Sequence, residues 1–270
     1  MIALLLTNAA VVLAMMLIVW LISIPLSDVS IVDLVWGMGF VLVAWTTFGL
    51  ADSRPTAELS PAWLLPLLTT IWGLRLSAYL AWRNVGRGED KRYVAMRAAR
   101  PKSFWWQSLL MVFGLQAVVM WIISLPLQFG IALPATHWTW LHLAGAGVWI
   151  VGLIFESVGD WQLVRFKQNP ENSGQVCDRG LWRYTRHPNY FGDFCIWWGL
   201  YLVAIAAGQH VWTIISPILM SLFLMKVSGV TLLEQTLTQD KPGYADYIRR
   251  TNAFFPGLPR TDHAVRLDER

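Results

Sequence analysis

The chain has 270 residues, of which 56% are hydrophobic and only 14% are charged. A soluble globular domain usually carries about a quarter charged residues, so this composition, with a mean hydropathy of +0.47, argues against a soluble fold. The 17 tryptophans agree, because indole rings favour membrane interfaces. The two cysteines, Cys177 and Cys195, indicate neither a disulfide framework nor a zinc site.

Apolar stretches of about 20 residues, the length that crosses a bilayer, recur along the chain. We expect seven spans, at roughly 2–26, 30–51, 61–85, 104–132, 139–167, 189–208 and 211–237. The first has no basic segment before it and no evident cleavage site, which predicts a retained span rather than a signal peptide. The fold class is therefore an all-α, polytopic membrane helical bundle, with one integral membrane domain (1–260) and a polar tail (261–270).

Basic residues concentrate in three segments, 83–102, 165–188 and 241–270, which hold 18 of the 21. With seven spans, all three segments fall on the same side of the membrane. The positive-inside rule makes that side cytoplasmic, so we expect the N-terminus outside and the C-terminus in the cytoplasm. The net charge of +4 then reflects topology and anionic lipid headgroups, and it does not indicate nucleic acid.

Several ionisable side chains lie inside predicted spans, where a charge costs about 2.5–3.5 kcal/mol and is usually paired or functional. They are Asp33, Arg75, Glu156, Asp160, Asp193, Lys226 and Glu234. Ion pairs between helices, such as Arg75 with Asp33 or Lys226 with Asp193, would explain them one at a time. As a set they favour a polar ligand with anionic and hydroxyl groups, because most lie near the cytoplasmic ends of the last three spans.

The stretch RYTRHPNYFGDF, which starts at Arg183, opens the sixth predicted span. Pro188 disfavours helix at His187 and can itself begin the next helix, so we expect the span to start near Asn189. The free N–H groups of a helix start bind anions, and guanidinium groups such as that of Arg186 bind phosphate. Arg183 and His187 would share a face if the residues between them are helical. The stretch predicts a site for an anionic group at the membrane surface.

The longer run GLWRYTRHPNYFGDFCIWWGLYL resembles the C-terminal signature of the steroid 5α-reductase family, which is approximately G-L-W-x-x-x-R-H-x-N-Y-x-G-[DE]-x-x-x-W-x-x-G. The matching residues are Gly180, Leu181, Trp182, Arg186, His187, Asn189, Tyr190, Gly192, Asp193, Trp197 and Gly199. The segment YADYIRRTNAFFPGLP is similar to the family's ending, and WGLRLSAYLAWRNVGRGEDKRY resembles its bacterial branch. The resemblance covers roughly residues 30–260.

This resemblance implies an NADPH-dependent reductase of a bacterial inner membrane. It would pass a hydride to a carbon–carbon double bond of a lipophilic substrate that enters from the bilayer, either a steroid-like enone or another unsaturated lipid. Residues 1–132 would serve the substrate and 133–260 the cofactor. The expected cofactor-binding residues are Arg75, Asp160, Arg165, Lys167, Arg179, Arg183, Arg186, His187, Asn189, Asp193, Tyr247 and Arg250. No metal site is expected, because the five histidines are scattered along the chain.

Reduction of a conjugated double bond also needs a donor that stabilises the enolate oxygen as the hydride arrives. Asp33 is the first candidate, because a carboxylic acid kept neutral by apolar surroundings can donate a hydrogen bond. Steroid-active relatives carry a Tyr on the third span, and setting Arg75 opposite the family's Arg places Trp72 at that position. An indole donates a hydrogen bond but does not readily transfer a proton, so Tyr190 and Tyr79 are alternative donors.

Two other functions compete with the reductase. Membrane methyltransferases of the isoprenylcysteine type carry a similar R-H-P-x-Y-x-G run and bind S-adenosylmethionine, which needs fewer cations because it has no phosphate. Asn189 favours the reductase, as do Asp33 and Arg75 far upstream. A non-catalytic protein that binds membrane lipids is the third possibility, and it predicts that changing Asp33 or Arg186 leaves function intact.

Overall fold

The computed structural model describes residues 1–51, 60–227, 234 and 241–260. Every regular element within these residues is a helix, which confirms the all-α prediction. The chain divides into two compact units. Unit 1 comprises Met1–Leu143 and Leu200–Ser216, and unit 2 comprises Ala144–Gly199 and Pro217–Arg270.

Five helical segments in the described part of the chain are long and apolar enough to cross a membrane. They are Ile2–Leu26, Pro61–Asn84, Phe104–Ile123, Trp140–Gln168 and Pro188–Ala207. Two shorter apolar segments, Trp36–Leu50 and Val211–Lys226, lie where the sequence predicts the second and seventh spans. The rest of the predicted seventh span, apart from Glu234, and the polar tail lie outside the described residues.

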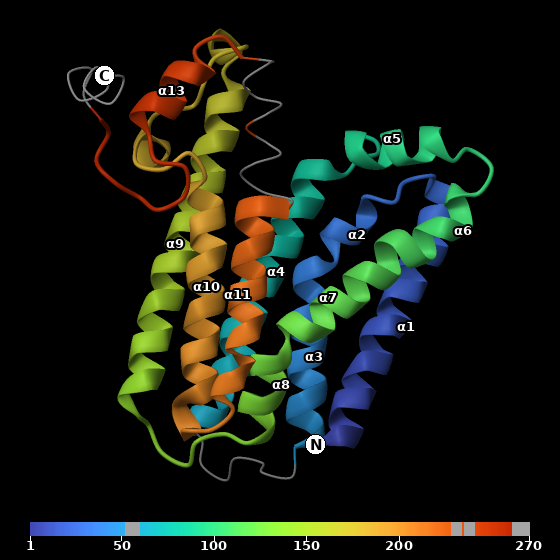
Figure 1. Ribbon diagram of the computed structural model, residues 1–270, viewed down its shortest axis with the longest axis vertical. Helices are drawn as coiled ribbons and strands as arrows, with labels where there is room; N and C mark the ends of the chain where they lie inside the picture. Colours follow the sequence, from blue (N-terminus) through green and yellow to red (C-terminus); the bar gives the residue numbers. More distant parts are fainter. Residues whose placement is uncertain (52–59, 228–233, 235–240, 261–270) are drawn as a thin grey trace. The chain divides into compact units, whose positions relative to one another are not determined.

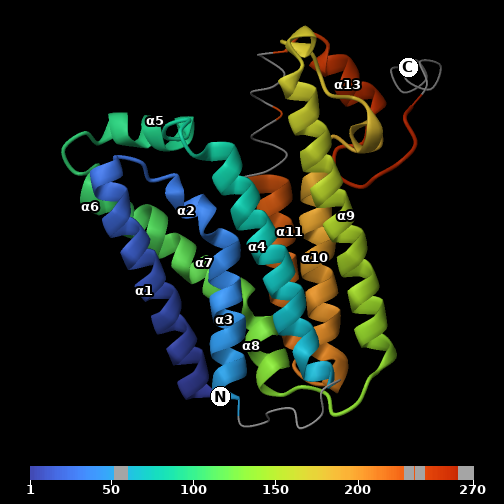
Figure 2. The same cartoon turned by 180° about the vertical axis from the view of Figure 1, so that it is seen from behind.

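The first helices of unit 1 run side by side, with a short helix across their ends (Figure 2). Its elements are α1 (Ile2–Leu26), α2 (Ile31–Leu34), α3 (Trp36–Leu50), α4 (Leu64–Asn84), α5 (Lys91–Ala99), α6 (Phe104–Ser108), a π-helical stretch (Leu109–Gly114), α7 (Leu115–Ile123) and α8 (Leu125–Ala132). Helices α3 and α4 pack through glycine, because a methyl group at Gly73 would lie 2.6 Å from the Gly37 carbonyl oxygen. The lack of a side chain at Gly37 and Gly73 therefore lets the two helix backbones approach closely.

Two predicted spans of unit 1 are interrupted in the structure. The span predicted at 30–51 is divided at Val35, which leaves Asp33 in the short helix α2 outside the apolar helix α3. The span predicted at 104–132 is divided at Ser124, between α7 and α8. Pro126 accounts for this break, because proline lacks the N–H that a helix interior needs and its ring collides with the preceding turn.

Buried polar side chains tie three elements of unit 1 together. The Asn8 amide in α1 donates to the Thr47 hydroxyl in α3 at 2.8 Å and to the Gln128 amide oxygen in α8 at 3.1 Å. Gln128 in turn donates to the Ser124 hydroxyl at 2.8 Å. All four side chains are fully buried. Hydrogen bonds of this kind fix the register of helices in an apolar environment, where packing alone is less directional.

Unit 2 is built on the antiparallel pair α9 (Trp140–Gln168, in unit 2 from Ala144) and α10 (Pro188–Ala204, in unit 2 up to Gly199), which lie side by side in Figure 1. Glycines spaced seven residues apart, Gly145 and Gly152 on α9 and Gly192 and Gly199 on α10, bring the two backbones together. A methyl group at Gly152 would lie 2.6 Å from the Gly192 carbonyl oxygen, and one at Gly199 would lie 2.6 Å from that of Gly145. This close approach places the polar end of α9 against the start of α10.

The remaining elements of unit 2 are short. They are the 3₁₀ helices Pro170–Asn172 and Gly180–Arg183, α11 (Ile215–Leu222, in unit 2 from Pro217), a π-helical stretch (Phe223–Val227) and α13 (Tyr244–Arg250). Helix α10 begins at Pro188, as the sequence predicts. The 3₁₀ helix ends at Arg183, so the residues between Arg183 and His187 are not helical and do not place both side chains on one face.

Candidate functional site

Two adjacent residues of the loop before α10 hold it against α9 by hydrogen bonds. The Trp182 indole donates to the Gly159 carbonyl at 3.0 Å, and the Leu181 amide donates to the Gln162 side-chain oxygen at 2.9 Å. The ring of Pro188 packs against Gly159, where a methyl group on the glycine would lie only 3.2 Å from the ring. The loop therefore has a fixed position relative to the buried acids of α9.

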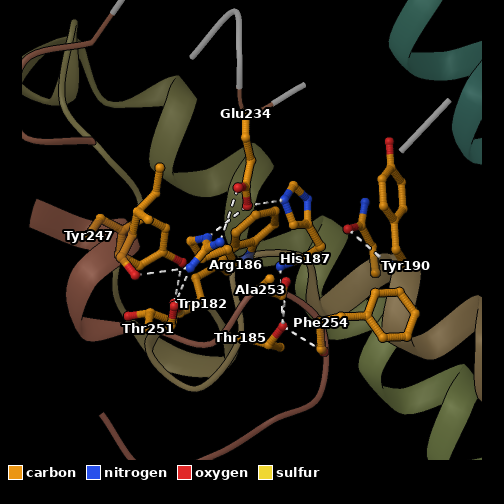
Figure 3. Close-up of polar contacts among 12 residues, drawn as sticks. Trp182, Thr185, Arg186, His187, Tyr190, Glu234, Tyr247, Thr251, Ala253 and Phe254 are labelled. Carbon is orange, nitrogen blue, oxygen red and sulfur yellow. Dashed lines mark hydrogen bonds and ion pairs between the residues drawn. The ribbon is translucent and has the colours of Figure 1, made fainter. Parts of the chain in front are cut away.

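Arg186 is the central residue of this loop, and its side chain points inward (Figure 3). Its guanidinium binds both carboxylate oxygens of Glu234, through Nε at 2.7 Å and Nη2 at 3.0 Å. Its Nη1 donates to the Ile248 carbonyl at 3.1 Å and to the Thr251 carbonyl. The side chain is only 8% exposed, so most of its donors are used inside the protein rather than turned to solvent.

His187 shares the same carboxylate. Its Nε2 lies 3.0 Å from Glu234 Oε1, and its ring stacks on Tyr190 with centroids 5.4 Å apart and planes 11° apart. Burial raises the pKa of Glu234, but hydrogen bonds from His187 and Arg186 outweigh it and leave that pKa below its ordinary value. Glu234 is thus a carboxylate at neutral pH, held by two donors.

The C-terminal segment closes over the loop. The Arg186 amide donates to the Asn252 carbonyl at 2.9 Å, and the Thr185 hydroxyl donates to the Phe254 carbonyl at 2.8 Å. The Tyr247 hydroxyl donates to the Trp182 carbonyl. Figure 3 shows the bonds of Thr185 and Tyr247. Together these bonds make residues 244–257 a structural cap on the start of α10.

Two acids of α9 are buried next to the first turns of α10. Glu156 and Asp160 lie one turn apart and are each 4% exposed. The Asn189 side-chain amide donates to Asp160 at 3.2 Å, and Asp193 follows Asn189 one turn along α10. The structure therefore joins Asp160 to Asn189 at the start of α10, with Asp193 one helical turn further along.

Five cations of the predicted cofactor-binding set lie on the surface of unit 2. They are Arg165, Lys167, Arg179, Arg183 and Arg250, all exposed. Arg165 lies over the Trp161 ring at 5.6 Å, and Arg250 lies 3.9 Å from Asp178. These side chains differ from Arg186 because their charges face solvent, where an anion has access to them.

The catalytic candidates Asp33 and Trp72, and the predicted cofactor-binding residue Arg75, belong to unit 1. Asp33 lies 3.5 Å from Arg92, and its side chain is 30% exposed. Burial nevertheless raises the pKa of this carboxyl to about 6, against the opposing charge of Arg92. Trp72 is fully buried beside Phe40, with ring centroids 5.8 Å apart. The Arg75 guanidinium lies over the Tyr79 ring at 5.2 Å.

The role of Glu234 is not evident from the sequence. Glu234 is an acid in the last predicted span, but its partners Arg186 and His187 stand 48 and 47 residues earlier. No helical spacing connects positions so far apart. The only available signal was an acid in an apolar stretch, which predicts a partner without identifying it.

Comparison with known proteins places the chain among uncharacterised relatives. The model of the family described as "Protein of unknown function (DUF1295)" matches residues 19–251. A relative from Schizosaccharomyces pombe, described as "Uncharacterized protein C594.04c", is 27% identical over 278 residues, covering 89% of this chain and 76% of the relative. No solved structure matches the chain.

Proposed function

Because the chain belongs to the DUF1295 family, whose function is unknown, we propose an activity from its residues: it is an NADPH-dependent membrane reductase. It reduces a carbon–carbon double bond of a lipophilic substrate, such as a steroid-like enone or another unsaturated lipid. The proposal extends the resemblance of residues 180–199 to the steroid 5α-reductase family.

The observation that carries the proposal is the arrangement of acids and cations around the start of α10. Buried Glu156 and Asp160, with the amide of Asn189, offer partners for ribose hydroxyls and for a carboxamide. Beyond them, exposed Arg165 and Lys167 end the same helix and offer charges to phosphates. A phosphorylated dinucleotide has both kinds of group, so these residues fit it.

NADPH, when bound, supplies the hydride, and the protein's task is to position the reactants and to stabilise charge. Asp33 is the proposed donor to the oxygen that becomes negative, because its raised pKa of about 6 keeps part of it protonated near neutral pH. The resemblance suggests Trp72 and Tyr190 as the other candidate donors. A fixed donor contributes most where water is excluded.

The proposed topology has seven spans, with the five long apolar segments and the two shorter ones in those roles. The basic segments would then face the cytoplasm of a bacterial cell, with the N-terminus on the other side of the inner membrane. This orientation gives the exposed cations access to cytoplasmic NADPH, while the substrate enters from the bilayer.

One observation favours an S-adenosylmethionine-dependent methyltransferase as the second candidate. Arg186, the motif's arginine, is occupied by Glu234 and by two backbone carbonyls, so it adds little charge for a phosphate. S-adenosylmethionine has no phosphate and would not need that charge. The exposed cations Arg165 and Lys167 still favour the phosphorylated cofactor.

Equilibrium titration of the detergent-solubilised protein separates these functions. NADPH, NADH and S-adenosylmethionine are added in turn, and binding is followed by tryptophan fluorescence and by calorimetry. The reductase predicts saturable binding of NADPH, weaker binding of NADH, and none of S-adenosylmethionine. Saturable binding of S-adenosylmethionine alone would replace the reductase by the methyltransferase, and binding of none would favour the lipid-binding protein.

A further inference from the structure

The protonation of the His187 ring follows from its contact with Glu234. An ionised carboxylate has acceptors and no donor. Since His187 Nε2 lies 3.0 Å from Glu234 Oε1, that nitrogen must carry the hydrogen. A neutral imidazole with hydrogen on Nε2 has none on Nδ1, which is then an acceptor.

Arg186 supplies the charge that Glu234 requires. It binds both oxygens of the carboxylate, so the pair is already neutral before His187 is counted. A protonated imidazole would add a second cation to one carboxylate at a site where Arg186 and His187 are only 8% and 2% exposed. A neutral imidazole completes the hydrogen bonds of the carboxylate without burying that charge.

We infer that Glu234 is a positioning residue that holds His187 as the Nε2–H tautomer, and that the unprotonated Nδ1 accepts a hydrogen bond from the nicotinamide riboside half of the cofactor. The second part rests on the proposed function. Ribose hydroxyls and the carboxamide N–H can donate a hydrogen bond to an unprotonated imidazole nitrogen. A phosphate at neutral pH offers mainly acceptors and would be repelled by it.

The roles of the motif residues are redistributed as a result. Arg186 was expected to bind phosphate, but in the structure it holds the Glu234 carboxylate, and His187 presents an acceptor to the cofactor. The phosphates are left to the exposed cations, Arg165, Lys167, Arg179 and Arg183. The start of α10 becomes the hydroxyl-binding end of the site, next to Asp160 and Asn189.

The tautomer can be measured directly by nitrogen NMR. Protein labelled with ¹⁵N-histidine is studied at pH 8 without any nucleotide, and the variant His187→Gln identifies the resonances of this ring. Long-range coupling to the ring protons distinguishes Nε2 from Nδ1. The ionisable groups around the ring are Glu234, Arg186, Tyr190 and Tyr244, and burial raises the pKa of Tyr244 so that it stays neutral at this pH.

The wild type is expected to show one tautomer only, with hydrogen on Nε2. Glu234→Ala is expected to give a mixture of tautomers, as in a free imidazole, whereas Glu171→Ala, at an exposed loop glutamate, is expected to leave the spectrum unchanged. Glu234→Gln keeps an acceptor and is expected to keep the tautomer, which covers the case that the alanine variant does not fold. A mixture in the wild type, or a single tautomer retained in Glu234→Ala, overturns the inference.

Cofactor affinity tests the second part. Glu234→Ala is expected to raise the Kd for NADPH about tenfold, the scale of one lost hydrogen bond, while Glu234→Gln raises it less than about threefold. An unchanged Kd in Glu234→Ala and in His187→Gln overturns the assignment of His187 to the cofactor. If the tautomer is fixed as expected but the wild type binds no NADPH, the proposed function fails and the positioning role of Glu234 stands.

Discussion

Replacing Arg186 by alanine should destabilise the folded protein itself, before any cofactor is added. The substitution removes the bidentate pair at 2.7 and 3.0 Å and the bonds to the Ile248 and Thr251 carbonyls. It also leaves the Glu234 carboxylate, which is 17% exposed, without its cation. Removing one partner of a buried ion pair costs about 3–5 kcal/mol, so we expect a loss of that size.

Two variants make this test specific. Arg186→Lys keeps the charge but lacks the planar fork that binds two oxygens at once, so it should lose roughly half as much, about 1–3 kcal/mol. Arg183→Ala removes an exposed arginine from the same loop and should stay within about 0.5 kcal/mol of the wild type. The free energy of unfolding is measured in micelles by denaturant titration, with tryptophan fluorescence as the signal.

The outcome separates the structural role of Arg186 from a phosphate-binding role. If Arg186 mainly held phosphate, its removal would leave the stability of the nucleotide-free protein unchanged and would weaken NADPH binding alone. A loss for Arg186→Ala no larger than that for Arg183→Ala would refute the clamp that the structure assigns to this side chain.

Three further predictions follow from other parts of the molecule. Gly152→Val should sharply lower the yield of folded protein in a size-exclusion profile, because the valine side chain would meet the α10 backbone. Gly147→Ala in the same helix is the control and should match the wild type, because an added methyl group there has nothing within 4 Å. The pKa of Asp33 is about 6 in the folded protein against an ordinary 3.8, so the folded state binds this proton more tightly than the unfolded state does. The free energy of unfolding should therefore fall by about 1–2 kcal/mol as the pH rises from about 4 to about 6. Asp33→Asn should remove this pH dependence, as measured by denaturant titrations at several pH values. If Arg179 or Arg183 binds the 2′-phosphate, its replacement by alanine should lower the ratio of the Kd for NADH to the Kd for NADPH about tenfold. An unchanged ratio in both variants would assign the 2′-phosphate to other residues.

Apolar patterning predicted much of the fold. The first span was expected at 2–26 and α1 occupies Ile2–Leu26, because a long apolar run in a membrane protein leaves few alternatives to helix. The start of α10 was predicted from Pro188, whose ring fixes one backbone angle and suits the first turn. Breaks inside apolar runs, such as the one at Ser124, were not predicted, because hydropathy does not register a change of helix direction.

The candidate site was predicted in part. The motif identified Arg186, His187 and Asn189, which do lie at the start of α10. The inward turn of Arg186 was not predicted, since an arginine beside a helix start is compatible with either an external anion or an internal acid. In the structure Arg186 binds the internal acid Glu234. The 48 residues between them leave no sequence pattern that would predict this contact.

The packing of α9 on α10 has a signal in the sequence, which is a repeat of glycines. Gly145, Gly152 and Gly159 recur every seven residues on one helix, and Gly192 and Gly199 do so on the other. Such a repeat marks a face of small residues, where two helix backbones approach closely. Read in this way, the sequence predicts which faces of the two helices meet.

Native mass spectrometry of the purified protein tests the central claim most directly. The protein is released from mild detergent after incubation with equal concentrations of NADPH and S-adenosylmethionine, and the mass of any bound molecule is recorded. We expect one NADPH per chain, retained also after removal of free nucleotide. Retention of S-adenosylmethionine in its place would contradict the account.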